Sequence, residues 1–140
     1  MMRANTREDT VREFDKVTGP RFGEGWTDPH VAHLRYKLME EELKEVKHEI
    51  TMVMFKLGVG KPITKEDRKA LLKELCDLQY VLSGTILAFS FDDIFDVAFN
   101  RVHSSNMSKI GPERVPVRRD DGKILKSEYY IPACFEDLID

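Results

Sequence analysis

Apolar residues recur three or four positions apart along most of the first 110 residues, the spacing of an amphipathic α-helix. Four segments show this pattern: residues 6–17, 29–57, 64–89 and 92–110. Gly19-Pro20 is expected to stop the first of them. We therefore predict an all-α protein, a four- to five-helix bundle over residues 6–110 with an extended C-terminal tail over residues 111–140.

Local signals mark where three of these helices begin. Asp28 before Pro29 is typical of an N-cap followed by proline at the first helical position. Thr64 and Asp67 are three residues apart, which is the spacing of a capping box. Asp92 is the expected N-cap of the fourth helix.

The third helix is apolar on nearly every side from Leu75 to Phe89. A helix that is apolar all round is normally buried. We therefore expect it to be the central helix of the bundle.

Composition narrows the class of protein. The 140 residues are 41% hydrophobic and 34% charged with a net charge of −3, which predicts one compact domain over residues 1–140. The balance argues against a disordered chain and against a protein that binds nucleic acid through bulk positive charge. No segment is typical of a membrane span or signal peptide, so no membrane partner is expected. Cys76 and Cys134 are 58 positions apart, which argues against a disulfide framework, so we expect a cytoplasmic protein.

Two pairs of carboxylates are the candidate chemistry. Glu42 and Glu45 share one face of the second helix, and Glu74 and Asp77 share one face of the third. If the two helices form an antiparallel hairpin, a rise of about 1.5 Å per residue places the pairs within roughly 5 Å of the same level. Converging carboxylates repel one another and need a neutralising cation. Hard divalent cations prefer oxygen ligands, so Mg²⁺ is expected, with Mn²⁺ as the alternative.

Two other interpretations of these acids are open. Clustered Glu residues among lysines often form a solvated helix face with i, i+4 ion pairs. Glu45-x-x-His48 also fits one element of a di-iron carboxylate bundle, but the third helix offers Glu74-x-x-Asp77 and no second histidine. The position of Glu74 and Asp77 in the most apolar helix favours the all-oxygen site.

Three motifs resemble the all-α nucleoside triphosphate pyrophosphohydrolases, which include MazG-like proteins, dimeric dUTPases and phosphoribosyl-ATP pyrophosphohydrolase. Glu41 to Glu45 reads EExxE, and after a spacer of 28 residues Glu74 to Asp77 reads ExxD. The stretch from Val102 to Lys109 is similar to the V-H-x-x-N-x-S-K stretch of the MazG-like, dUTPase-type members. The tail over residues 121–132 also resembles that subgroup.

The resemblance implies metal-dependent hydrolysis of a nucleoside triphosphate to the monophosphate and pyrophosphate, with dUTP or a related nucleotide as the expected substrate. Phosphoribosyl-ATP is the alternative substrate, and a non-catalytic helical interaction protein is the alternative class. The implied metal ligands are Glu42, Glu45, Glu74 and Asp77. Glu41 or Glu42 is the implied residue that orients the attacking water. The implied substrate contacts are Asn106, Lys109 and Lys123.

The resemblance also implies a homodimer or homotetramer with the site near the subunit interface.

Charge is distributed in keeping with an anionic substrate. Residues 39–50 hold five acids and two bases, whereas residues 109–126 hold six bases and three acids. The small net charge therefore conceals an acidic block and a basic block.

Overall fold

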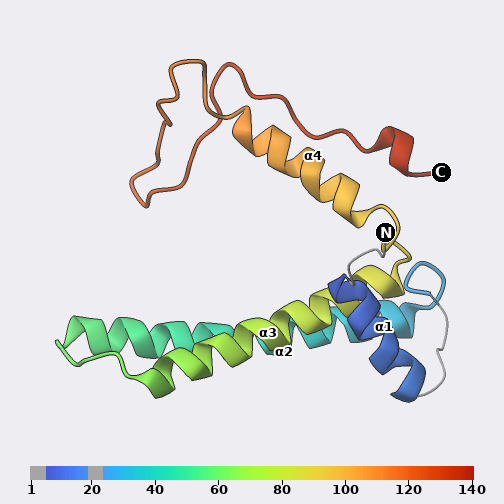
Figure 1. The fold of residues 1–140 in the computed structure, drawn as a ribbon, viewed down its shortest axis with the longest axis horizontal. Helices are drawn as coiled ribbons and strands as arrows, with labels where there is room; N and C mark the ends of the chain where they lie inside the picture. The colour runs from blue at the N-terminus through green and yellow to red at the C-terminus, as the bar shows by residue number, and fades with distance from the viewer. Residues whose placement is uncertain (1–5, 19–23) are drawn as a thin grey trace, which may run out of the picture. The chain divides into compact units, whose positions relative to one another are not determined.

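The computed structural model describes residues 6–18 and 24–140 (Figure 1). Its helices are α1 (Arg7–Thr18), α2 (Pro29–Gly58), α3 (Lys65–Ala88) and α4 (Phe95–Met107), with a short 3₁₀ helix η1 (Glu136–Leu138) in the tail. The predicted all-α fold with a C-terminal tail is confirmed. The expected stop at Gly19-Pro20 lies outside the described residues. No helix in these two ranges is long and apolar enough to cross a membrane.

The chain folds as two compact units. One unit ends at Phe91 and contains α1, α2 and α3, and the other begins at Asp92 and contains α4 and the tail. In the first unit α3 packs against both α2 and α1, so α3 is the central helix there, as the sequence predicts.

The helix α2 and the helix α3 form an antiparallel hairpin whose ends are fixed by polar contacts (Figure 1). The Asp28 side chain caps α2 by accepting a hydrogen bond from the His30 amide at 2.9 Å. The capping box of α3 is confirmed, because Thr64 and Asp67 each accept a hydrogen bond from the other's backbone amide. Lys56 of α2 reaches across the turn to Asp67 at 2.6 Å, which ties the two helices together at the hairpin.

A buried arginine ties the other end of the hairpin. The Arg35 guanidinium of α2 donates to the Val81 carbonyl at 3.0 Å and to Thr85 Oγ1 at 3.3 Å, both on α3. A Cβ atom at Gly84 would collide with the Arg35 guanidinium. Glycine at this position therefore allows the guanidinium to lie against the α3 backbone.

The helix α1 lies against α3 through a small buried patch. Val11 is buried, and the Glu8 carboxylate accepts a hydrogen bond from the fully buried Ser83 hydroxyl at 3.4 Å. Ser83 in turn accepts a hydrogen bond from the Gln79 side chain at 3.0 Å. The polar side chains in this patch therefore satisfy one another.

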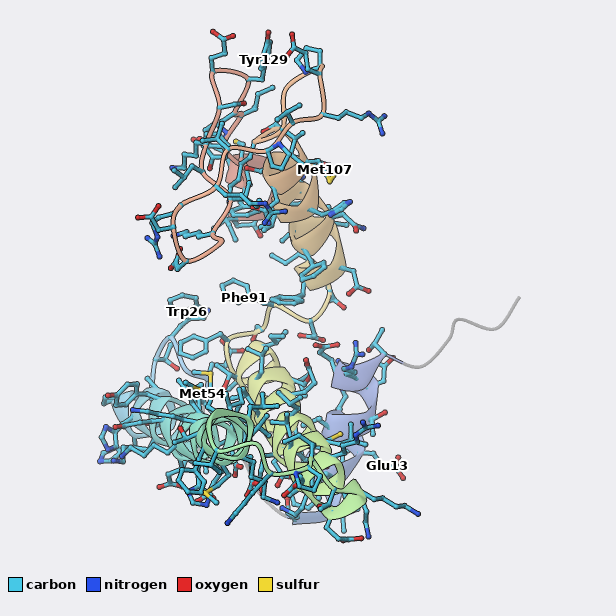
Figure 2. The ribbon with its side chains drawn as sticks, turned by 90° about the vertical axis from the view of Figure 1, so that its left-hand side faces the viewer. Glu13, Trp26, Met54, Phe91, Met107 and Tyr129 are labelled. Atoms are coloured by element: carbon cyan, nitrogen blue, oxygen red, sulfur yellow. The ribbon has the colours of Figure 1, made fainter. Side chains whose placement is uncertain are left out.

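The residues before α2 are held against the end of α3 by an aromatic cluster. The Trp26 indole donates to the Phe89 carbonyl at 2.9 Å, and its ring packs edge-on against the rings of Phe89 and Phe91 at 4.8 and 5.6 Å (Figure 2). The Gly25 amide donates to the Ala88 carbonyl at 2.8 Å. These contacts hold the segment before α2 against the C-terminal end of α3.

The prediction that the third helix is buried on nearly every side is wrong for this chain. Ile86 is 4% exposed, but Leu75 and Leu82 are 45% and 38% exposed. Because α2 and α1 cover only part of the α3 surface, apolar side chains on its remaining side stay open to solvent.

The start of α4 also differs from the prediction. The N-cap is Ile94, which makes no side-chain capping hydrogen bond, and the helix begins at Phe95 rather than after Asp92. The Ala98 amide donates to the Ile94 carbonyl at 3.0 Å, whereas Asp92 lies in the turn that precedes the helix. Residues 92–94, which the sequence pattern places at the start of the helix, instead form the turn that precedes it.

The tail folds back on α4 instead of remaining extended throughout. Arg118 and Ile124 form an isolated antiparallel bridge, and Gly122 takes a positive φ of 93° in the turn between them. The Arg101 guanidinium of α4 pairs with both carboxylate oxygens of Asp137 and donates to the Cys134 carbonyl at 3.0 Å. The end of the tail is therefore anchored on α4.

Replacing Asp67 with alanine should lower the Tm at neutral pH, because the variant loses the Lys56 contact and half of the capping box. The hydrogen bonds from Lys56 and from the Thr64 backbone lower the pKa of Asp67 from 3.8 to about 2. The stability that the carboxylate contributes is therefore present above pH 3.8 and lost as the pH falls to about 2. Thermal unfolding at a series of pH values should show the wild-type and D67A curves converging in acid. A Glu66→Ala variant serves as the control, since Glu66 is exposed and pairs with Lys69 in the same helix. A loss of Tm that is equal at every pH would contradict this explanation.

Candidate metal centre

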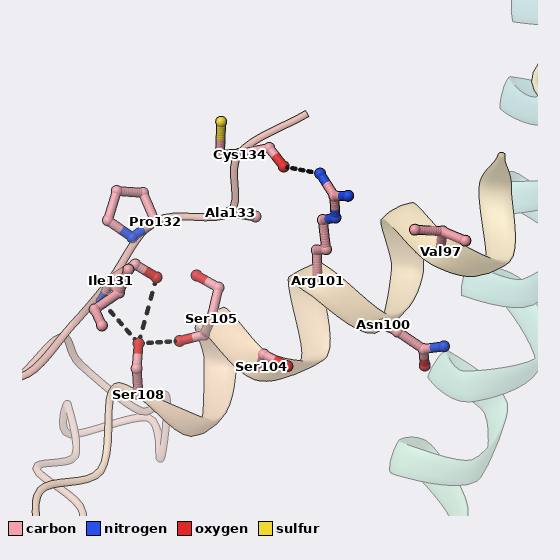
Figure 3. Close-up of a pocket in the computed structure, with 10 residues that line it drawn as sticks. All are labelled: Val97, Asn100, Arg101, Ser104, Ser105, Ser108, Ile131, Pro132, Ala133 and Cys134. Carbon is pink, nitrogen blue, oxygen red and sulfur yellow. Dashed lines mark hydrogen bonds between the residues drawn. The ribbon is translucent and has the colours of Figure 1, made fainter. Parts of the chain in front are cut away.

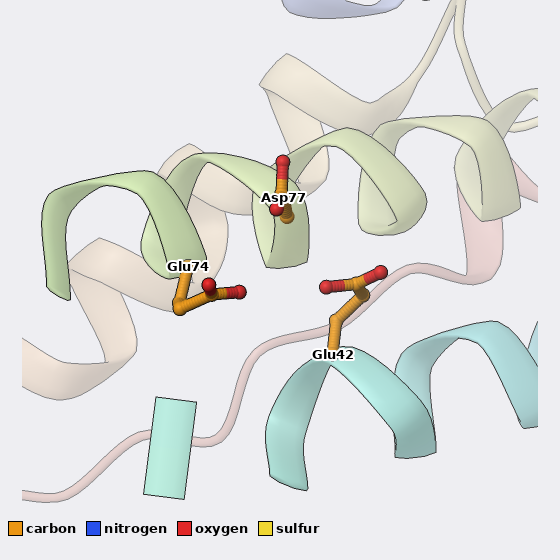
Figure 4. A group of neighbouring side chains, drawn as sticks. All are labelled: Glu42, Glu74 and Asp77. Atoms are coloured by element: carbon orange, nitrogen blue, oxygen red, sulfur yellow. The ribbon is translucent and has the colours of Figure 1, made fainter. Parts of the chain in front are cut away.

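Three carboxylates meet across the seam between α2 and α3. One oxygen each from Glu42, Glu74 and Asp77 can be chosen so that all three lie within 4.8 Å of one another (Figure 4). Glu42 comes from α2, and the other two come from α3. All three side chains are half-buried. The convergence predicted from the hairpin is therefore present for three of the four acids.

Helix periodicity explains why these side chains point into the seam. Glu74 and Asp77 are three residues apart and so project from neighbouring positions on one face of α3. On α2, Val46 follows Glu42 by four residues, and Val46 is buried. Glu42 therefore occupies the edge of the packed face of α2, where its carboxylate can reach across to α3.

The electrostatics of the cluster are unfavourable for a bare carboxylate. Partial burial raises the pKa of Glu42, and the negative charges of Asp77 and Glu74 raise it further. Lys73 opposes these effects, whereas Glu45 adds to them. Carboxylates this close, with only oxygen ligands to offer, fit a hard divalent cation that would neutralise them.

A lysine that the sequence analysis did not single out lies beside the cluster. The Lys73 ammonium donates to Asp77 Oδ2 at 2.6 Å and lies 3.6 Å from Glu74 Oε1. The hydrogen bond and the charge of Asp77 raise the pKa of Lys73. The i, i+4 spacing of Lys73 and Asp77 could have indicated this pair, because residues at that spacing are neighbours on a helix surface.

The remaining predicted acids lie outside the group of three. Glu45 and Glu41 are exposed on α2. Glu45 is close enough to influence the pKa of Glu42 but contributes no oxygen to the 4.8 Å group. The roles of Glu41 as a water-orienting residue and of Glu45 as a metal ligand stay predictions. His48, the residue of the di-iron alternative, is exposed on α2 and is not part of the group.

The predicted substrate contacts belong to the second unit. Asn106 and Lys123 are exposed and Lys109 is half-buried. Lys109 follows α4, and its amide donates to the Asn106 carbonyl at 3.2 Å as the helix ends. Their roles in binding stay predictions.

The same unit contains a cavity of about 540 Å³ between α4 and the tail (Figure 3). Its polar lining includes Arg101, Ser104 and the buried Ser105, and its apolar lining includes Ile131 and Pro132. Asn106 and Lys109 are not among the residues that line it. The predicted contacts and this cavity are therefore separate features of the unit.

The acids lie on facing helices of an all-α fold and are close enough to share a cation. This is the arrangement predicted by the motifs that resemble the MazG-like nucleoside triphosphate pyrophosphohydrolases. Comparison with protein families agrees. The sequence profile described as phosphoribosyl-ATP pyrophosphohydrolase matches residues 11–106. The chain belongs to this family, which is part of the MazG-like all-α superfamily. Comparison with curated proteins finds no match.

The family match changes the order of the two predicted substrates. It supports a nucleotide pyrophosphohydrolase and favours the alternative, phosphoribosyl-ATP, whereas it gives no support to dUTP. The matched range includes all four predicted ligand acids and Asn106. It ends before Lys109 and Lys123.

Replacing Glu42 with glutamine should stabilise the metal-free chain at neutral pH. The pKa of Glu42 is raised in the folded chain, so the folded state binds more protons than the unfolded state over the affected range. The wild type therefore loses stability as the pH rises through that raised pKa, and E42Q should lack this loss. Thermal unfolding against pH in the presence of EDTA measures the effect, with Glu66→Gln as the control. A metal-free Tm for E42Q below that of the wild type would contradict it.

Mn²⁺ should restore stability to the wild type and much less to E42Q. A cation that binds only the folded state stabilises it by about 2.7 kcal/mol at 100 times its Kd, which is several degrees of Tm in a domain of this size. The same titration of E66Q should follow the wild type. An equal rise in Tm for E42Q and the wild type would place the cation elsewhere.

Proposed function

We propose that this protein hydrolyses a nucleotide between its α and β phosphates in a reaction that depends on a divalent cation. Water attacks one of the two phosphorus atoms that the α–β bridging oxygen joins. The bond between that phosphorus and the bridging oxygen breaks, and the products are the monophosphate and pyrophosphate. The observation that carries the proposal is the group of Glu42, Glu74 and Asp77 within 4.8 Å on two helices of a chain that belongs to a pyrophosphohydrolase family.

The residues of the first unit divide into two roles in this proposal. Glu42, Glu74 and Asp77 would hold the cation, with Glu45 as the fourth predicted ligand. When bound, Mg²⁺ or Mn²⁺ supplies charge neutralisation at the phosphate oxygens and lowers the pKa of water. Glu41 or Glu42 would orient the attacking water, since a carboxylate accepts its hydrogen bond.

Phosphoribosyl-ATP is the substrate that we propose first, because the matching family is described by this activity. The similarity of Val102 to Lys109 to the V-H-x-x-N-x-S-K stretch makes dUTP the competing candidate in any test. Both carry the same triphosphate, so the predicted phosphate contacts of Lys109 and Lys123 apply to either, whereas Asn106 would contact the sugar or base.

We also propose that the protein assembles as a homodimer or homotetramer. The support is the exposed apolar surface of the first unit, where large side chains of α2 and α3 meet solvent. The most exposed of these are Leu57, Met54 and Leu72. Burying such side chains against a second copy is favourable by about 25 cal/mol per Å² of apolar surface.

Pyrophosphate release should occur from phosphoribosyl-ATP in the presence of Mg²⁺ and stop with EDTA. A panel that includes dUTP, dCTP, dTTP and purine nucleoside triphosphates compares kcat/KM under the same conditions. Glu74→Gln and Asp77→Asn should each lower kcat by at least about a hundredfold, since each removes a charged cation ligand. Glu66→Gln, an acid of α3 outside the group, is the control. Absence of turnover on every nucleotide would refute the proposed function, and full activity of D77N would refute the ligand assignment.

Replacing Lys109 with alanine should raise KM for the nucleotide by about tenfold to a hundredfold, the value of one charge-assisted hydrogen bond to phosphate. The loss of kcat should be smaller if the contact is equally strong in the ground state and transition state. Lys61→Ala is the matched control, because Lys61 is an exposed lysine at the α2–α3 turn. Steady-state kinetics that show the same KM for K109A and the wild type would remove Lys109 from the site.

A further inference from the structure

Lys73 is the cationic side chain nearest to the carboxylate group in the described part of the chain. Its ammonium lies 2.6 Å from Asp77 Oδ2 and 3.6 Å from Glu74 Oε1, so it contacts two of the three acids. The Lys73 side chain is nevertheless 69% exposed, whereas that of Glu74 is only 16% exposed. The ammonium therefore approaches the group from solvent, and its long stem is free to turn away.

We propose that Lys73 is an exchangeable counter-ion of the metal centre. Its ammonium neutralises Asp77 and Glu74 while no divalent cation is bound, and it leaves them when the cation binds. The displaced ammonium then lies beside the phosphates of the substrate and pairs with one of their oxygens. The second half of this inference rests on the proposed function, whereas the exchange itself does not.

Electrostatics favours exchange over joint occupancy. A dication held by Glu42, Glu74 and Asp77 carries twice the charge of the ammonium and has oxygen ligands from both helices. An ammonium in contact with the same carboxylates would lie close to that dication and be repelled by it. An exposed lysine–carboxylate pair contributes little stability, so little is lost when Lys73 moves away.

The exchange predicts that removing the ammonium strengthens cation binding. Titration calorimetry of Mn²⁺ into the full chain, without nucleotide, should give a Kd about twofold to fivefold lower for Lys73→Gln than for the wild type. The ratio should shrink at high ionic strength, where exposed charges are screened. Lys73→Arg keeps a cation at this position and should stay close to the wild type.

Lys69 offers a matched control one turn earlier on α3. It is also exposed and pairs with an acid three residues away, with 3.2 Å between Lys69 Nζ and Glu66 Oε2. Lys69→Gln should therefore leave the Kd for Mn²⁺ unchanged. An unchanged or higher Kd for K73Q, with the Tm of the wild type, would overturn the exchange, because a merely structural ion pair would not compete with the cation.

The proposed pairing of Lys73 with a substrate phosphate predicts that K73Q weakens nucleotide binding, whereas the exchange predicts that K73Q strengthens cation binding. In steady-state assays with saturating Mn²⁺, K73Q should raise KM for the nucleotide by about fivefold to tenfold while kcat changes less, and K73R should recover most of the affinity. An unchanged KM would overturn this half.

The two measurements separate failure of the inference from failure of the proposed function. A lower Kd in K73Q for a protein that hydrolyses no nucleotide would refute the function and keep the exchange. Turnover together with an unchanged Kd would refute the exchange and keep the function.

Discussion

Repulsion among Glu42, Glu74 and Asp77 is the force that the α2–α3 hairpin has to withstand. One oxygen from each lies within 4.8 Å of the others. Partial burial weakens solvent screening and so strengthens the repulsion between their negative charges. Burial raises the pKa of Glu42 in the folded chain, and the negative charges of Asp77 and Glu74 raise it further. A cation bound among the three carboxylates would relieve this repulsion, so an arrangement that opposes folding suits a metal centre.

Two polar ties between α2 and α3 lie away from the acids, toward the two ends of the hairpin. At the turn, Lys56 of α2 pairs with Asp67 of α3. Toward the other end, the buried guanidinium of Arg35 donates to the α3 backbone at Val81. Neither tie involves the three carboxylates, so a cation bound among them would leave both ties in place. The helices therefore hold the carboxylates near one another through contacts outside the group.

Local and periodic features of the sequence were sufficient to predict most of this arrangement. The capping box at Thr64 is readable because its residues are three positions apart, and the meeting of acids follows from the helical rise. Features that depend on tertiary packing were not readable. The start of α4 after Ile94 depends on the preceding turn, and the exclusion of Glu45 from the group depends on side-chain placement. The exposure of Leu75 shows the same limit, because composition does not reveal how much of a helix its neighbours cover.

Ser108, within the stretch that resembles V-H-x-x-N-x-S-K, joins the end of α4 to the tail. Its hydroxyl donates to the Ser105 carbonyl at 2.6 Å and accepts a hydrogen bond from the Ile131 amide at 2.8 Å, which joins the end of α4 to a tail segment 23 residues further on. The serine in the stretch from Asn106 to Lys109 therefore holds the tail against the end of α4. A relative whose chain lacks this tail segment would have no Ile131 amide for the serine to bind. The serine of this motif is therefore tied to the fold of the tail that follows α4.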